Sequence, residues 1–289
     1  MKDKLKPFSL QNPIKIKFRN ISGWSGIDSY WIKLLQKYGK PVVRAEKNPD
    51  LIFYSVFGPY NLLPFRVSKA RLVFFTGENS NPDRFADFNI TFDPSESNHN
   101  LRMPLWTQQP LDPYFQMRLE NKTKFCSFIY SHKIKLRNQL CQAIAKYKTV
   151  DCGGDCLNNL GYKVKEKATF QKQYKFDIAC ENSSSKGYVT EKIINAYHSH
   201  CIPIYWGAEE IEKDFNPETF INAKNFSSFN ELVRYIAAVD QDKKLYESYF
   251  NKPIFSQKWQ KAFSDGGDKF YKEVCDKICP PSSFPLEKS

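Results

Sequence analysis

The chain has 289 residues, of which 41% are hydrophobic and 16% are aromatic. This composition excludes disordered, collagen-like and low-complexity chains, and the length predicts two domains of medium size. The 43 Lys and Arg residues against 31 Asp and Glu give a net charge of +12, which favours an anionic partner such as nucleic acid, a phosphorylated substrate or an acidic membrane surface.

The start of the chain and the cysteines bear on the compartment. The charged start, with Pro7, has no apolar run of signal-peptide length, and no apolar stretch reaches the ~18 residues of a membrane span. We therefore expect a cytoplasmic protein with reduced thiols. Cys152/Cys156 and Cys275/Cys279 share a C-x3-C spacing, but no histidine lies near either pair, so core thiols are favoured over zinc.

Short apolar strands alternate with helical patterns along the chain, which predicts an α/β fold. The strands expected in the first part are 14–18, 51–56, 71–76 and 89–92. A helix is expected over 29–38, with Tyr30, Leu34 and Leu35 on one face. The polar, proline-containing stretch 106–124 is typical of an interdomain linker.

The strand–helix pattern restarts after this stretch. The strands expected in the second part are 124–130, 148–151, 175–181, 201–206 and 219–222, and the helices are 136–147, 190–199, 228–239 and 256–277. We therefore divide the chain into domains 1–120 and 121–265, with a C-terminal helix end and tail over 266–289. Two such domains predict two doubly wound sheets facing a central cleft, with ligands beyond the carboxyl ends of the strands.

The loop between the strand 175–181 and the next helix carries the clearest chemical signal. A helix that opens near Lys192 presents free backbone N–H groups, which suit a diphosphate. A lysine in that first turn opposes the helix dipole unless phosphates arrive to neutralise it. Glu191 is favourable at this terminus for dipole reasons alone, and Asn182 also suits a plain turn. The residues favour a nucleotide-phosphate site over a plain crossover connection.

The run from Glu181 to Lys192, Glu-Asn-Ser-Ser-Ser-Lys-Gly-Tyr-Val-Thr-Glu-Lys, resembles the donor-binding motif of the α1,3-fucosyltransferases of glycosyltransferase family 10. The resemblance is nearest to bacterial members, and it continues in the segments 74–79, 101–105, 196–197, 203–207 and 214–217. It implies a GT-B fold with two Rossmann-like domains, the first binding the acceptor and the second binding GDP-fucose. It also implies inverting transfer of L-fucose to a GlcNAc hydroxyl.

The resemblance assigns roles to residues by position. Glu78 matches the family's proposed general base, which takes the proton of the acceptor hydroxyl. Arg137 matches a diphosphate-contacting arginine, and Lys192 matches the lysine that balances the GDP leaving group. Without the resemblance, Glu78 suits a solvated loop and Arg137 is one charge in a basic run. The residues that match contacts to the ribose, phosphates or fucose are Asn182, Tyr188 and Glu191, and the supporting candidates are Glu181 and Arg102.

We expect GDP-fucose as the donor substrate and no obligatory cofactor or metal. A divalent metal is expected at most to stimulate turnover. Asp240-Gln241-Asp242 fits the D-x-D pattern of metal-dependent glycosyltransferases. It follows a helical pattern rather than a strand, so we expect a helix end there. The charge of GDP is then balanced by Arg137, Lys192 and the helix dipole.

The resemblance implies an N-acetyllactosamine-type glycan acceptor on lipopolysaccharide, fucosylated at the GlcNAc 3-hydroxyl to a Lewis-type structure. Aromatic residues of the first domain are candidates for stacking on sugar faces, although each also suits ordinary packing. They are Trp24, Tyr30, Trp31, Phe57 and Tyr60. Another acceptor or an α1,4 linkage on the same fold is the first alternative.

A basic nucleic-acid-binding protein is the second alternative. No nucleic-acid-binding motif accompanies the charge, so no nucleic-acid partner is expected. Peripheral contact with the cytoplasmic face of the inner membrane stays open, because most of the surplus charge has no other assignment.

Overall fold

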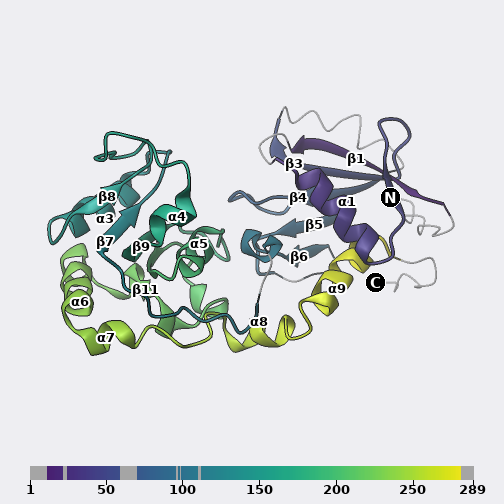
Figure 1. Cartoon of the computed structure of the whole chain (residues 1–289). Helices are drawn as coiled ribbons and strands as arrows, with labels where there is room; N and C mark the ends of the chain where they lie inside the picture. The colour runs from purple at the N-terminus through teal and green to yellow at the C-terminus, as the bar shows by residue number, and fades with distance from the viewer. Residues whose placement is uncertain are drawn as a thin grey trace. The chain divides into compact units, whose positions relative to one another are not determined.

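The computed structural model describes residues 12–21, 25–58, 70–95, 97, 99–109 and 112–280. The chain divides into two compact units (Figure 1), one formed by Met1–Pro104 with Asp265–Ser289 and the other by Leu105–Ser264. This division differs from the expected one, because the first unit ends before residue 120 and takes up the end of the chain. Facing of the two units across a cleft stays a prediction.

The first unit contains a parallel sheet with the strand order β2-β1-β3-β4-β5-β6. Its strands are β1 Ile14–Ile21, β2 Val42–Arg44, β3 Leu51–Phe57, β4 Arg71–Phe75, β5 Phe88–Thr91 and β6 Asn100–Arg102. The inner strand β3 is buried over its first five residues, as expected for a parallel strand with both faces covered. Among the described residues of this unit, the α-helices are α1 Ile27–Lys37 and α9 Asp268–Ile278, which lie beside each other in Figure 1 and share a Lys37–Asp268 ion pair of 2.9 Å.

Two expectations about helices need correction. The face of α1 that enters the core carries Ile27, Trp31 and Leu35, whereas the expected Tyr30 and Leu34 are only partly buried at its border. The single helix expected over 256–277 is two helices, α8 Gln257–Ala262 and α9, because Gly266 and Gly267 between them have φ of +76° and +82°. The break lets α9 pack on the first unit.

The second unit contains a parallel sheet with the order β11-β10-β9-β7-β8. Its strands are β7 Lys124–Phe128, β8 Val150–Cys152, β9 Tyr174–Cys180, β10 Ile202–Trp206 and β11 Ile221–Asn222. Its α-helices are α3 Lys135–Ala145, α4 Lys167–Gln171, α5 Lys192–His198, α6 Phe229–Gln241, α7 Lys243–Glu247 and α8. In both units the first strand lies between the second and the third, which is a doubly wound order and confirms the predicted α/β class.

The stretch expected as a linker is part of the second unit. Its first residues form a 3-10 helix, Leu105–Gln108, and the Trp106 side chain is completely buried. The Trp106 ring lies 4.9 Å from the Trp259 ring and 5.3 Å from the Phe255 ring, measured between centroids. The linker prediction was wrong because this aromatic cluster joins residues far apart in sequence.

Among the helices of the described residues, none has the length and apolar character needed to cross a membrane. All eight cysteines are buried, and none forms a disulfide.

Candidate active site

The sheet of the second unit has a switch point between β7 and β9. The chain passes from β7 to β8 on one side of β7, and β9 then pairs with the other side. In doubly wound sheets, ligands bind beyond the carboxyl ends of the strands at this point. Arg137 of α3 and Asn182, which follows β9, meet there, with Arg137 Nη1 lying 3.3 Å from Asn182 Oδ1.

Arg137 is a buried cation at this edge, with 1% of the residue exposed. Its Nη2 donates to the His132 carbonyl at 2.9 Å, and its Nη1 also approaches the Cys180 carbonyl at 3.4 Å. Within the described residues, no carboxylate pairs with the guanidinium and its Nε has no hydrogen-bond partner. A buried, unpaired cation is unfavourable, and a bound anion would stabilise it.

The ring of Tyr130, which follows β7, packs against the Arg137 guanidinium. The Arg137 guanidinium carbon lies 3.9 Å from the centroid of the Tyr130 ring, within cation–π range. The Tyr130 hydroxyl donates to the Ile178 carbonyl at 2.7 Å and accepts from the Cys180 amide at 2.8 Å, which ties β9 to β7. Burial raises the pKa of this hydroxyl well above its usual value, so it stays neutral. Sequence reasoning missed Tyr130.

Glu181, Thr190 and Lys192 form a compact polar cluster just after β9. The Glu181 carboxylate is completely buried, accepts from the Thr190 amide at 2.7 Å and forms a 2.9 Å ion pair with Lys192 Nζ. Burial raises the pKa of Glu181 above its usual value, and the neighbouring Lys192 ammonium opposes this shift. The sequence offered Glu181 as a supporting candidate, but Thr190 was missed.

The loop that carries these residues is fastened to the end of β10. Ser184 Oγ donates to the Gly207 carbonyl at 2.9 Å, and Lys224 Nζ donates to Ser184 Oγ at 2.7 Å. A Cβ on Gly207 would lie 2.6 Å from Glu181 Cγ and would also collide with the Tyr205 hydroxyl. The close approach of this backbone to Glu181 therefore requires glycine.

The other predicted donor contacts differ in accessibility. Asn182 is exposed, Glu191 is half-buried, and Tyr188 is 2% exposed. The helix α5 begins at Lys192, two residues later than expected, with Glu191 at its N-cap and without a side-chain capping bond. The structure thus brings Arg137 and Asn182 into contact and pairs Lys192 with Glu181, the residue before Asn182. Their roles toward a donor stay predictions.

Glu78 and Arg102 belong to the first unit. Glu78 follows β4 in a half-buried turn, where its amide donates to Thr76 Oγ1 at 3.0 Å. Among the described residues, no group forms a hydrogen bond or ion pair with the Glu78 carboxylate. Arg102 Nε donates to the Phe92 carbonyl at 3.2 Å. The pairing of Glu78 with the donor site stays a prediction.

The aromatic residues expected to stack on sugars have different surroundings. Trp31 is a core residue with 1% exposure, and its ring packs on Phe53 at a centroid distance of 5.1 Å. Tyr30 and Phe57 are half-buried. Trp24 and Tyr60 lie outside the described residues. Burial of Trp31 in the core excludes it as a stacking surface.

The D-x-D sequence is engaged in structural contacts. Asp240 lies in the last turn of α6 and accepts from Lys175 Nζ at 2.7 Å and from Lys148 Nζ at 2.9 Å. Asp242 caps the start of α7 by accepting from the Lys244 amide at 2.8 Å. In the described part of the chain, no cluster of three or more His, Cys, Asp or Glu side chains has the arrangement of a metal site.

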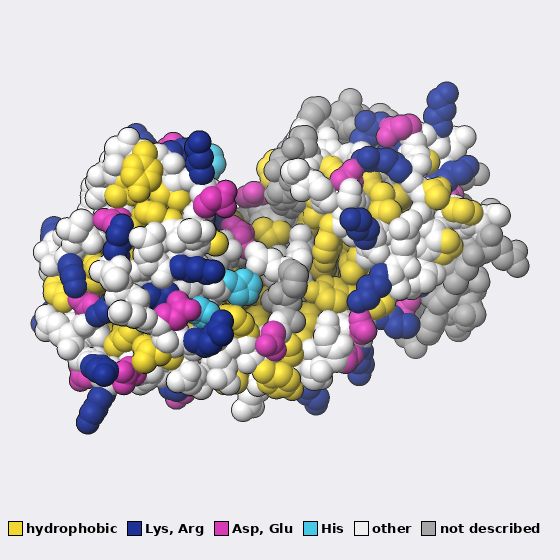
Figure 2. All heavy atoms as spheres, viewed as in Figure 1, with side chains coloured by type: hydrophobic (Ala, Val, Ile, Leu, Met, Phe, Trp, Pro, Cys, Tyr) yellow, Lys and Arg dark blue, Asp and Glu magenta, His cyan; other side chains and the backbone are white. Residues whose placement is uncertain are grey.

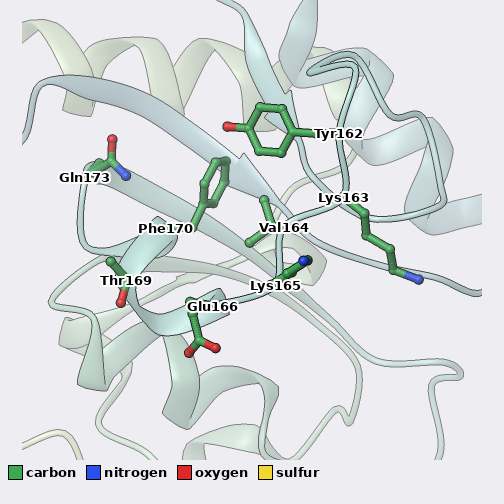
Figure 3. Close-up of a pocket in the computed structure, with 8 residues that line it drawn as sticks. All are labelled: Tyr162, Lys163, Val164, Lys165, Glu166, Thr169, Phe170 and Gln173. Carbon is green, nitrogen blue, oxygen red and sulfur yellow. The ribbon is translucent and has the colours of Figure 1, made fainter.

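A pocket of about 440 Å³ lies elsewhere in the second unit, between the loop before α4 and α4 itself (Figure 3). Its lining residues are Tyr162, Lys163, Val164, Lys165, Glu166, Thr169, Phe170 and Gln173. None of them belongs to the predicted site.

Two family profiles match the chain. Residues 119–280 match "Glycosyltransferase family 10 (fucosyltransferase) C-term", and residues 16–109 match "Alpha-(1,3)-fucosyltransferase FucT N-terminal domain". The first segment contains Arg137 and Lys192, and the second contains Glu78.

Three known proteins show the same relationship. "Alpha-(1,3)-fucosyltransferase FucT" of Helicobacter pylori is 33% identical over 84% of this chain, which spans only 60% of that relative's length. "4-galactosyl-N-acetylglucosaminide 3-alpha-L-fucosyltransferase 9" of Mus musculus is 28% identical over a match that covers 57% of this chain and 46% of that relative's length. A crystal structure of an α1,3-fucosyltransferase with GDP-fucose matches with a TM-score of 0.69 and 29% identity, covering 94% of this chain and 93% of that one.

The structural match confirms the GT-B type of fold. The family 10 profile covers more than half of the 289 residues. The chain therefore belongs to glycosyltransferase family 10, the family of the fucosyltransferases.

Proposed function

We propose that this protein transfers L-fucose from GDP-fucose to the 3-hydroxyl of GlcNAc in an N-acetyllactosamine-type glycan. Membership of the family and the GDP-fucose complex of a structural relative support the donor. The observation that carries the proposal is the buried Arg137 guanidinium, which has no carboxylate partner among the described residues and lies at the switch point of the sheet. A diphosphate is an anion of suitable charge for this position.

The charges of the site suit a departing nucleoside diphosphate. Arg137 and Lys192 contribute two positive charges, and Glu181 offsets one of them through its ion pair with Lys192. The buried Arg137 guanidinium keeps its charge without a carboxylate partner among the described residues, and electrostatic stabilisation of a leaving group is strongest at low dielectric. In our proposal, Arg137 and Lys192 stabilise the charge that develops on the β-phosphate as the bond to fucose breaks.

Glu78 is the proposed general base for an inverting single displacement. The acceptor oxygen forms a bond to C1 of fucose on one face, while the bond from C1 to the β-phosphate oxygen breaks on the other. The hydroxyl proton passes to the Glu78 carboxylate, and GDP leaves with the bonding electron pair. The absence of competing partners for this carboxylate in the described part of the chain supports the assignment.

We propose that no metal is obligatory, because Arg137 and Lys192 supply the positive charge, and that a divalent ion at most stimulates product release. Turnover of GDP-fucose in excess EDTA tests this. Complete loss of turnover that Mn²⁺ restores would contradict the proposal.

The acceptor is proposed from the relatives. The name of the Mus musculus relative specifies a 4-galactosyl-N-acetylglucosaminide acceptor and a 3-linked fucose. We extend this to a Lewis-type product on lipopolysaccharide, made in the cytoplasm with peripheral contact at the inner membrane. The net charge of +12 supports attraction to an anionic lipid surface. On the face seen in Figure 2, Lys and Arg side chains are scattered among polar and acidic ones and form no single stripe.

One experiment tests the proposed function. The protein is incubated with GDP-fucose and a panel of disaccharides, and the new linkage is located by NMR. An α1,3 linkage on Gal-β1,4-GlcNAc is the expected result, whereas an α1,4 linkage or another preferred acceptor would replace the finer assignment. Steeply salt-dependent binding to DNA without GDP binding would instead favour a nucleic-acid-binding protein.

A further inference from the structure

The Thr190 hydroxyl lies between the two charged groups of the Glu181–Lys192 pair. Thr190 Oγ1 lies 2.8 Å from Glu181 Oε2 and 3.1 Å from Oε1, and Lys192 Nζ lies 2.8 Å from Thr190 Oγ1. We infer that Thr190 is a positioning residue, which fixes the direction of the Lys192 ammonium toward the leaving diphosphate. This inference rests on the proposed function for its catalytic meaning.

The donor and acceptor roles in this triangle are fixed by chemistry. An ionised carboxylate only accepts and an ammonium only donates, so the threonine hydroxyl must donate to Glu181 and accept from Lys192. Lys192 Nζ donates to Glu181 Oε2 at 2.9 Å and to Thr190 Oγ1 at 2.8 Å, and the 2.8 Å contact between these two oxygen atoms places both acceptors on one side of the nitrogen. At least one of the three N–H groups therefore points away from this pair, and no described residue accepts from it.

The anchor of this triangle is rigid. Glu181 is completely buried, its amide donates to the Trp206 carbonyl at 2.8 Å, and its carboxylate is held by the Thr190 amide. The approach of Gly207 leaves the Glu181 side chain little space to move. A rotatable lysine is therefore held by fixed partners, which lowers the ordering cost when a phosphate oxygen binds to the remaining N–H.

The hydroxyl of Thr190 makes both hydrogen bonds of the triangle, and its methyl group makes neither. Thr190→Val keeps the shape and removes the hydroxyl, whereas Thr190→Ser keeps the hydroxyl and removes the methyl group. We expect Thr190→Val to lower kcat for fucose transfer by about tenfold to a hundredfold, the worth of a hydrogen bond to a charged group. We expect Thr190→Ser to stay within about threefold of the wild type.

A purely structural role would reverse the order of the two variants, because the buried methyl group would then matter most. A double-mutant cycle with Lys192→Met adds a second readout. If Thr190 acts through Lys192, Thr190→Val has almost no further effect on kcat in the Lys192→Met background. Equal losses in both variants, near-normal kcat in Thr190→Val, or an undiminished effect in the Lys192→Met background would each overturn the inference.

A readout that needs no activity separates this inference from the proposed function. In the ¹⁵N-labelled protein, the Lys192 ammonium is assigned by its loss in Lys192→Arg, and its hydrogen exchange is measured by NMR. We expect slow exchange in the wild type and in Thr190→Ser, and faster exchange in Thr190→Val. Slow exchange without any fucose transfer would refute the proposed function alone. Fast exchange in the wild type would refute the positioning by Thr190, whatever the activity.

Discussion

Replacement of Arg137 by lysine keeps the positive charge but removes the planar fork. In the structure, the guanidinium donates to three oxygen atoms at 2.9, 3.3 and 3.4 Å and stacks on Tyr130 at 3.9 Å. A lysine reaches only part of this set and cannot stack as a plane. The short hydrogen bond to the His132 carbonyl and the buried cation–π contact account for most of the stabilisation, and the two longer hydrogen bonds add little. We therefore expect Arg137→Lys to lower the free energy of unfolding of the second unit by about 2–4 kcal/mol.

Thermal unfolding measures this loss. For a unit of the size of Leu105–Ser264, a loss of that magnitude corresponds to a fall in Tm of roughly 4–16 °C. Arg234→Lys is the matched control, because Arg234 is exposed on α6 and the same change there should leave Tm nearly unchanged. Isothermal titration with GDP, performed at a temperature below the unfolding transitions of both variants, should show weaker binding in Arg137→Lys only. Equal Tm and equal GDP affinity in the two variants would refute the reasoning.

Three further outcomes are expected. Glu78→Gln should lower kcat by orders of magnitude while GDP affinity in titration calorimetry stays nearly intact, and near-normal kcat would refute Glu78 as the base. Gly207→Ala should lower both Tm and kcat, because a Cβ would lie 2.6 Å from Glu181 Cγ, and an unchanged Tm would show that the loop moves aside freely. Burial opposes ionisation of Asp240, but the hydrogen bonds from Lys175 and Lys148 outweigh it and lower its pKa. The ionised Asp240 carboxylate should therefore contribute about 1–3 kcal/mol to the free energy of unfolding at neutral pH, and this contribution should be lost as the pH falls through the lowered pKa. Asp240→Asn should remove this part of the acid dependence, measured by unfolding in urea at several pH values. An unaltered acid dependence would refute the pairing.

The sequence by itself determined the class of fold and the place of the donor loop. Apolar strands such as β3 and β9 are continuous in sequence, so their periodicity is visible without tertiary contacts. The run Glu181–Lys192 is also local, so its resemblance to one family motif is enough to place Asn182 and Lys192 in the same loop.

Only the tertiary structure decided which contacts these residues make. The Arg137 side chain meets Asn182 and Tyr130 because α3, β7 and β9 converge at the switch point of the sheet. The pairing of Lys192 with Glu181 and Thr190 depends on how the loop folds back, and backbone geometry of this kind has no periodic signal. Long-range packing likewise decided the unit boundaries. Trp106 is buried against Trp259, so the stretch predicted as a linker belongs to the second unit. Two glycines of positive φ end the helical region after α8, and α9 belongs to the first unit. Sequence patterns report local preference, whereas burial and charge pairing depend on partners distant in the chain.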